Sequence, residues 1–261
     1  MTQEKVYIQS KQCGSYQHIE FDYTEKKNAL NSELFIQLGD AIVEAENNPQ
    51  VRTILLTGRG TLFSVGGDLD DFKDNPFAKG FAATGFYQCM VRMFRCNKPI
   101  VAAVHGAAVG GAATLLLSCD IVVAAEGTTF LFPFSQLGIN AELCSSYLLP
   151  LTVGMRYASK WILLSEPVDS TEAKEAGLVT DVVPMDQLDQ RAQKYISRLT
   201  ELVPRSLRTN KRLLRHGHMA ALSDVLSEES KALEEGFASE ELQEAIAAFK
   251  GKRKADFSRF S

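Results

Sequence analysis

A single carboxylate lies in the otherwise uncharged stretch FPFSQLGINAELCSSYLLP, residues 132–150. It belongs to Glu142, whose neighbours are leucine, isoleucine, phenylalanine and small residues. A carboxyl group in such surroundings loses hydration, which disfavours its charged form and makes the carboxylate a stronger base. Two interpretations are open at this point: Glu142 sits idle on a surface turn, or it is a buried acid that transfers protons.

Two glycine-containing turns suggest a second kind of chemistry. The first, LFSVGGDLDDF, spans residues 62–72, and the second, VHGAAVGGAATLLLSCD, spans residues 104–120 and runs directly into a helical pattern. Glycine lets a backbone approach a ligand closely, and a helix N-terminus leaves N–H groups unpaired. Two such turns that face each other could hold one oxyanion between two backbone N–H groups, whereas a single glycine turn is more often only a tight turn.

Short apolar runs that end in glycine must position these turns. Residues 52–58, 98–106 and 120–127 are continuous apolar runs, which is typical of strands buried on both faces. A short helix at 110–120 is expected between the last two of them, because its glycine and alanine residues permit close packing. One later run, at 177–184, predicts a further strand.

Helical patterns complete the organisation. An amphipathic helix is predicted within residues 31–49, with Asn31 or Ser32 as its N-cap. Apolar residues recur every four positions along it: Leu34, Leu38 and Ile42. From residue 188 the chain is helical in pattern to its end, with a strongly basic segment at 203–218. This C-terminal part is expected to be a docking element.

Composition excludes several classes of function. Hydrophobic residues make up 45% and charged residues 23% of the 261 residues, as in ordinary globular proteins. The formal net charge of −4 argues against nucleic acid as a partner. No apolar run reaches the length of a membrane span and no signal or transit pattern begins the chain, so a cytoplasmic protein is expected.

Competing motifs fail on particular residues. GRGTLF lacks the third glycine of a dinucleotide fingerprint, and GAAVGGAA lacks the Lys-Ser/Thr of a P-loop. Five scattered cysteines indicate neither a disulfide framework nor a zinc site, and no metal site is expected. Cys144 has no local histidine to activate it as a nucleophile. His105 is expected to make a structural hydrogen bond at a strand end.

The order of these motifs resembles the crotonase (enoyl-CoA hydratase/isomerase) superfamily. The resemblance rests on RTILLTG, FSVGGDL, KPIVAAVHGAAVGGA and SCDIVVAAEGTTF, and it extends from about residue 15 to the C-terminal AFKGKRKADF. It implies an α/β fold, a spiral of ββα units with a helical C-terminal trimerisation region. We expect residues 1–200 to form the core with the CoA and acyl pocket, and residues 201–261 to form that region in a homotrimer or dimer of trimers.

The resemblance also implies a reaction. The family binds acyl-CoA thioesters and polarises the thioester carbonyl with two backbone N–H groups, which match those of Gly67 and Gly111. Hydratases of the family use two glutamates, and the matching positions here are Thr114 and Phe134. The single glutamate a few residues past the LG resembles the peroxisomal-type delta(3)-delta(2)-enoyl-CoA isomerases, which implies that Glu142 is the catalytic base.

The remaining site residues follow from the same resemblance. The backbone of VGGDL is expected to hold CoA, and apolar side chains after it to exclude water from the acyl group. Lysines near the entrance and residues of AFKGK are expected to reach CoA, the latter often from a neighbouring subunit. The expected contacts are Lys26, Lys27, Val65, Gly66, Asp68, Leu69, Phe134, Leu137, Phe249 and Lys252, with Phe130 and Phe132 as further lining. No separate cofactor is expected, because coenzyme A is part of the substrate.

Four alternatives remain beside an enoyl-CoA isomerase. The chain could be a non-catalytic acyl-CoA-binding or scaffolding relative, or an enoyl-CoA hydratase-like enzyme of other specificity. It could also be a hydrolase or a dienoyl isomerase. The last normally has further acids in its pocket, and Asp68 and Asp70 beside the first glycine turn are usually structural in this family.

Overall fold

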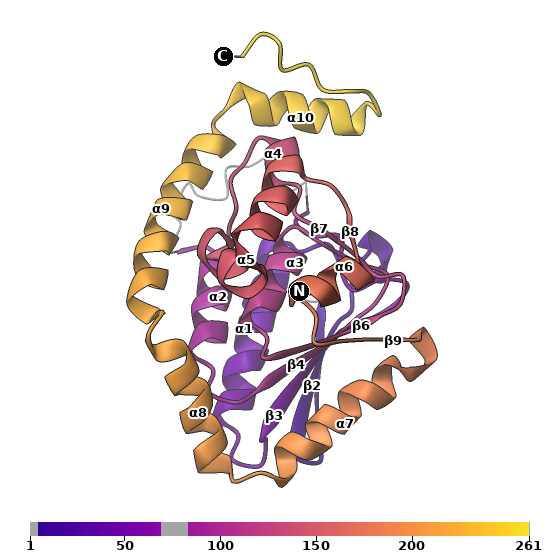
Figure 1. Ribbon diagram of the computed structural model, residues 1–261, viewed down its shortest axis with the longest axis vertical. Helices are drawn as coiled ribbons and strands as arrows, with labels where there is room; N and C mark the ends of the chain where they lie inside the picture. The colour runs from indigo at the N-terminus through magenta and orange to yellow at the C-terminus, as the bar shows by residue number, and fades with distance from the viewer. Residues whose placement is uncertain (1–4, 69–82, 261) are drawn as a thin grey trace.

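The structure is a computed structural model that describes residues 5–68 and 83–260 (Figure 1). Its main sheet has six strands in the order β1-β2-β3-β4-β6-β9, and a second sheet has three in the order β5-β7-β8. β1 pairs with β2 in antiparallel fashion, and every later pair in the main sheet is parallel. The main-sheet strands are Ile8–Cys13, Tyr16–Phe21, Thr53–Gly58, Ile100–Val104, Ile121–Ala125 and Asp181–Val183; the others are Ala107–Val109, Thr129–Leu131 and Val168–Asp169.

Helices cover both faces of the main sheet. α7 packs on β3, β4 and β6, while α1, α2 and α3 lie on the opposite face (Figure 1). The described helices are α1 Ser32–Asn47, α2 Gly85–Arg95, α3 Gly111–Leu115, α4 Phe134–Leu137, α5 Ser145–Leu164, α6 Ser170–Ala176, α7 Leu188–Glu201, α8 Pro204–His216, α9 Met219–Phe237 and α10 Glu240–Lys250. From α8 to Lys250 the chain is helical, with α9 along one side of the molecule and α10 across α4 (Figure 1). The prediction of helix to the end of the chain is wrong for residues 251–260, which form turns and irregular backbone.

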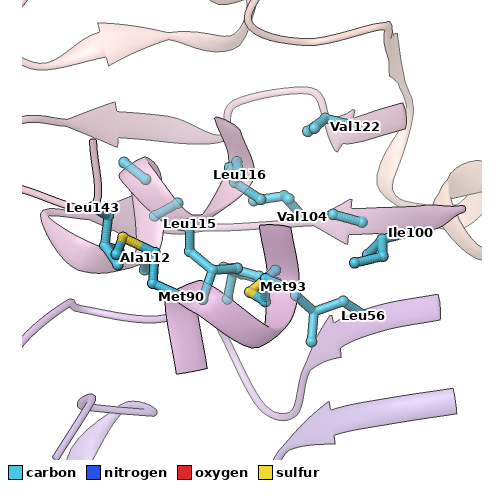
Figure 2. Packing of buried hydrophobic residues seen from close by; sticks show 14 of the residues in the cluster. Leu56, Met90, Met93, Ile100, Val104, Ala112, Leu115, Leu116, Val122 and Leu143 are labelled. Atoms are coloured by element: carbon cyan, nitrogen blue, oxygen red, sulfur yellow. The ribbon is translucent and has the colours of Figure 1, made fainter. Parts of the chain in front are cut away.

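The hydrophobic core lies between the main sheet and the helices α1, α2 and α3. Figure 2 shows Met90 and Met93 of α2 among side chains of β3, β4 and α3. All the side chains labelled in that view are buried. This packing fixes the position of α3, which immediately follows the second glycine turn.

Local sequence explains the elements nearest to the turns. The Asn31 side chain accepts a hydrogen bond of 2.7 Å from the N–H of Leu34, which starts α1 as the capping pattern predicted. Gly106 bends the chain from the main sheet into β5. Its φ is +65°, and a Cβ there would lie 2.4 Å from the carbonyl oxygen of Thr61. His105 beside it makes the expected structural hydrogen bond, 2.9 Å to Gly60 O.

Several predicted boundaries change in the structure. The strand predicted at 98–106 ends at Val104, and the one at 177–184 shrinks to Asp181–Val183. The helix predicted at 110–120 is the five-residue α3 followed by a 3₁₀ turn, Leu116–Ser118. The 20-residue helix α5 was not predicted. It contains Pro150 and a kink at Gly154, which interrupt the helical pattern.

Candidate active site

The first glycine turn is held against the start of α1 and against the second turn. Leu30 donates its N–H to Gly66 O at 2.8 Å and accepts from the N–H of Asp68 at 3.0 Å. This bridge uses the groups on either side of Gly67, so the Gly67 N–H points away from Leu30. Within the described residues no hydrogen bond uses that N–H.

Close contact between the two turns requires Gly66. Its φ is +82°, and a Cβ at this position would lie 2.3 Å from the carbonyl oxygen of Val109. A side chain would therefore push the turns apart, and the left-handed backbone itself disfavours residues other than glycine. The glycine pair thus serves two purposes: Gly66 allows the contact, and Gly67 presents a free N–H.

The second turn presents a free N–H for a different reason. Gly110 O accepts from the N–H groups of Ala113 and Thr114, at 2.8 and 3.0 Å, as α3 begins. Gly111 is the first residue of that helix, so its N–H has no partner inside the helix. No other described group accepts from it either. Gly67 and Gly111 line the same cavity, whose volume is about 1190 Å³.

Glu142 lies beside Gly111 and not on a surface turn. A Cβ on Gly111 would be 3.7 Å from Glu142 Oε1, and Glu142 is only 6% exposed. Thr114 Oγ1 donates to Oε1 at 2.7 Å. The second oxygen, Oε2, is buried and accepts no hydrogen bond within the described part of the chain. One carboxylate oxygen is therefore anchored, and the other is free to take a proton.

Burial raises the pKa of Glu142 to about 8. Desolvation is the largest cause, the hydrogen bond from Thr114 opposes it, and the charge of Glu229 adds to it. Burial also raises the pKa of the Cys144 thiol to about 12, so this cysteine stays protonated and is a poor nucleophile. The neighbouring acid is thus tuned for proton transfer near neutral pH, whereas the thiol is not.

The loop that carries Glu142 is fixed by side chains. Ser145 Oγ accepts from the Glu142 N–H at 3.1 Å, and the Ser145 N–H donates back to Glu142 O at 3.0 Å. Glu229 of α9 accepts from the N–H groups of Cys144 and Ser146, at 2.7 and 2.9 Å. The acid is therefore positioned by contacts with its own helix start and with the C-terminal region.

The cavity brings most of the predicted site residues together. Those that line it are Lys26, Lys27, Val65, Gly66, Gly67, Asp68, Gly111, Phe134, Leu137, Glu142, Phe249 and Lys252. Leu69 and Asp70 lie outside the described residues. Phe249 and Lys252 line the cavity of their own chain, although the family resemblance often places them in a neighbour's.

Charged side chains at the cavity differ in their surroundings. Lys26 Nζ forms an ion pair of 2.8 Å with Asp68, so the Asp68 carboxylate is engaged at the wall. Glu25 is exposed. Among the described lining residues, the carboxylates are those of Glu25, Asp68 and Glu142. Glu142 is the one of these three placed beside Gly111.

Comparison with known proteins identifies the family. The sequence model described as enoyl-CoA hydratase/isomerase matches residues 13–259. The chain belongs to this family. Acyl-CoA thioesters are typical substrates of the enoyl-CoA hydratase/isomerase family, and its crotonase fold is the fold that the sequence resemblance implied.

Individual relatives carry both activity names. The chain is 34% identical to 2,3-dehydroadipyl-CoA hydratase of Escherichia coli K12, covering 88% of this chain and 90% of that one. It is 32% identical to human enoyl-CoA delta isomerase 2, covering 90% of this chain and 61% of that one. A solved enoyl-CoA hydratase/isomerase from Pseudoalteromonas atlantica T6c has a TM-score of 0.90 and 34% identity, with coverage of 97% and 100%. Names alone leave the reaction open between hydration and isomerisation.

Two expectations about the residues that line the cavity are wrong. Phe130 and Phe132 do not line the cavity: both are fully buried in the core, and Phe132 stacks on Trp161 with ring centroids 5.8 Å apart. Leu131 lines the cavity instead. Side chains alternate between the two faces of a strand, and β7 turns Leu131 towards the site.

Sequence reasoning missed residues supplied by distant elements. Leu30 precedes α1, Phe35 belongs to the first turns of α1, and Leu233 and Phe237 come from α9. Glu229 was also missed, although it left a signal. It occupies the apolar stripe of α9, whose other buried members are Leu222, Leu226 and Leu233. A carboxylate on a buried helix face requires a hydrogen-bonding partner.

Two searches bear on other kinds of function. Among the described residues, no helix combines the length and apolar character needed to cross a membrane. The same residues contain no group of three or more metal-binding side chains placed to hold an ion.

Proposed function

We propose that this protein is an enoyl-CoA isomerase that moves the double bond of a 3-enoyl-CoA to the 2-trans position. The observation that carries the proposal is a buried carboxylate with one oxygen that has no described partner, in the same cavity as two glycines whose backbone N–H groups no described hydrogen bond uses. The carboxylate is that of Glu142, and the glycines are Gly67 and Gly111.

The proposed reaction needs one proton carrier. Glu142 takes a proton from C2 of the substrate, and the C2–H electron pair forms a dienolate. The N–H groups of Gly67 and Gly111 donate to the thioester oxygen as its negative charge develops. The protonated Glu142 then delivers the proton to C4, which leaves the double bond between C2 and C3 and restores the carboxylate. The atoms of the substrate are only rearranged.

The environment of Glu142 suits both steps. Its raised pKa makes the ionised form a strong base and the protonated form a competent donor near neutral pH. C2 and C4 lie on one short segment, so a carboxylate held by Thr114 can reach both with little movement. The apolar wall, including Phe134 and Leu137, excludes water that would compete for the intermediate.

Hydration is less well supported by the same site. Addition of water needs groups that position and split it, and the family's two glutamate positions hold Thr114 and Phe134 here. Thr114 donates its hydroxyl to Glu142, and Phe134 is a buried apolar lining residue. Because relatives are named hydratases, hydration remains the activity to measure beside isomerisation.

Binding of CoA and assembly are part of the proposal. Lys27 and Lys252 line the cavity and are candidates for contact with CoA phosphates. Assembly as a homotrimer is supported by large apolar side chains left exposed on α5 and α8. These side chains are Leu151, Met155, Leu163, Leu164, Leu213 and Leu214. The division into a core of residues 1–200 and a trimerisation region stays a prediction.

The decisive experiment replaces Glu142 by glutamine. Purified wild-type protein should convert 3-hexenoyl-CoA to the conjugated 2-enoyl-CoA, which is followed by ultraviolet absorbance. Glu142→Gln keeps the shape and should lower kcat by about 10²-fold or more, because its amide cannot take the proton. Glu126→Gln, in the exposed turn after β6, is the matched control. Near-normal isomerisation by Glu142→Gln, or hydration of crotonyl-CoA outpacing isomerisation in the wild type, would overturn the proposal.

A further inference from the structure

Two residues directly after Glu142 adopt a backbone that side-chain-bearing residues rarely adopt. Leu143 and Cys144 have φ values of 56° and 57°, both in the left-handed region. Such conformations are costly for residues other than glycine and persist only where the surroundings enforce them. Two in succession therefore require strong contacts, and these contacts decide where the Glu142 side chain points.

A carboxylate from the C-terminal helical region makes those contacts. Glu229 of α9 is 5% exposed. Its Oε2 accepts from the Cys144 N–H at 2.7 Å, and its Oε1 accepts from the N–H and hydroxyl of Ser146, at 2.9 and 2.5 Å. These donors stand at the start of α5, where backbone N–H groups have no helical partner. Asn140 adds a contact from the other side of Glu142, donating to the Glu229 carbonyl oxygen at 3.1 Å.

Packing and hydrogen bonding act on the same loop. The side chain of Leu143 is buried in the main core cluster with Ala112 of α3 and Met90 of α2 (Figure 2). The Cys144 thiol donates to Leu222 O of α9 at 3.6 Å. Leu143 thus fixes the loop to the core, and Cys144 fixes it to α9. The Glu229 carboxylate adds hydrogen bonds to the same loop.

We propose that Glu229 is a positioning residue that holds the Leu143–Cys144 backbone in its left-handed form and thereby fixes the Glu142 carboxylate in the cavity next to Gly111. The inference rests on the proposed function, because it assigns to Glu229 the task of orienting the proton carrier. Three donors on two oxygens need an acceptor with lone pairs on both, which a carboxylate provides and an amide does not.

Glu229 also sets the electrostatics of the site. Its negative charge raises the pKa of Glu142, after the larger effect of burial. Among the described residues the Cys144 thiol belongs to the same electrostatic cluster, and burial keeps it neutral. Burial also raises the pKa of Glu229 itself, while the hydrogen bonds from Ser146 and Cys144 lower it. Removing the charge of Glu229 should therefore lower the pKa of Glu142. A residue that merely stabilised the fold would leave that pKa where it is.

The test compares two adjacent glutamates of α9. Glu229→Gln places an NH₂ group against a backbone N–H, so kcat for 3-hexenoyl-CoA should fall about tenfold while KM changes less than twofold. The rise of kcat with pH should also move to lower pH. Glu228→Gln is the matched control, because this neighbour is exposed and pairs with Lys231 at the surface. It should behave like the wild type.

A second variant covers the case in which Glu229→Gln does not fold. Ser146→Ala removes only the hydroxyl donor and leaves the carboxylate in place, so kcat should fall about threefold. Unchanged kcat and an unchanged pH profile in a folded Glu229→Gln protein overturn the proposal. If that variant does not fold, unchanged kcat in Ser146→Ala overturns it.

Infrared spectroscopy separates this inference from the proposed function. The carboxyl band of Glu142, identified as the wild-type band that Glu142→Gln removes, gives its pKa without any turnover. A wild-type protein without isomerase activity would refute the proposed function, while the infrared pKa would still show whether Glu229→Gln acts on Glu142. If Glu229→Gln leaves the infrared pKa of Glu142 unchanged, the positioning role is refuted even in an active enzyme.

Discussion

The two halves of the candidate active site are held in different ways. The wall formed by the glycine turns, residues 64–68 and 109–111, is fixed by backbone hydrogen bonds to Leu30, to Leu131 and between the turns. The loop that carries Glu142 is fixed by side chains, chiefly Thr114, Ser145 and Glu229. The wall therefore depends on which residues lack a side chain, and the loop on which residues have one.

This difference separates two tasks. Charge stabilisation at the thioester oxygen uses backbone groups that need no particular side chain and no titration. Proton transfer uses a carboxyl group whose position and pKa both depend on neighbours. Thr114 links the halves, because it belongs to α3 behind the wall and donates to Glu142 in the loop. Variants of each half should consequently fail in distinguishable ways.

The largest effect in the wall is expected from Gly66→Ala. The added methyl group would meet Val109 O at 2.3 Å on a backbone with φ of +82°. We expect the free energy of unfolding to fall by about 3 kcal/mol and activity to drop about 10²-fold, since the turns separate. Gly14→Ala is the matched control, because Gly14 also has a positive φ but faces open space. Equal behaviour of the two variants would show that close contact is unimportant.

Glu142, the acid of the loop, should give the reaction a steep pH dependence. The base must be ionised, and Glu142 has a pKa of about 8. The value of kcat/KM should thus rise about tenfold per pH unit below pH 8 and level off above it. Since the folded pKa lies above that of the unfolded chain, stability should fall as pH rises from about 4.5 to 8. Thermal unfolding should show this fall reduced in Glu142→Gln; a flat rate profile would contradict the assignment.

The link between the halves should have a moderate effect. Thr114→Val keeps the shape but removes the hydroxyl that lowers the pKa of Glu142, so that pKa should rise further. At pH 7 we expect kcat/KM to fall about fivefold, with much of the loss recovered at higher pH. Thr128→Val removes another buried hydroxyl, one that donates to Val104 O, and should leave the pH profile unchanged. A pH-independent loss in Thr114→Val would point to packing alone.

The smallest effect is expected at the cavity entrance. Lys252→Ala should raise KM for the CoA substrate about threefold and leave kcat unaltered, because an exposed charge contributes little binding free energy. Added salt should shrink the difference. Lys194→Ala on α7 is the control, as this exposed lysine lies outside the cavity. An effect on kcat would mean that residue 252 influences the reacting end of the site.

The same contrast explains what could be predicted from sequence. The wall is encoded locally: glycines follow apolar strands, and Asn31 starts α1 where the pattern placed it. Glu142 attracted attention because a lone carboxylate in an apolar stretch is unusual. The anchor of its loop, however, is Glu229, which lies 85 residues beyond Cys144, and no local pattern joins the two.

The sequence also could not predict which side chains of β7 face the cavity and which face the core. Phe130 and Phe132 fit an apolar pocket by composition, yet both are buried in the core. The pairing of β7 with β5 turns Phe130 inward and leaves Leu131 at the cavity. Register decides this, and a shift of one residue would reverse it. The extent of α3 was also hidden, since a run of alanine and leucine suits an α-helix and a 3₁₀ turn alike.

A crystal structure with hexanoyl-CoA, a saturated thioester that cannot isomerise, tests the central claim most directly. We predict that the thioester oxygen lies about 3 Å from both the Gly67 and the Gly111 nitrogen atoms. We also predict that the free oxygen of Glu142 lies beside C2 and C4 of the acyl chain. A thioester oxygen bound elsewhere, or a Glu142 carboxylate turned away from the acyl chain, would contradict the account.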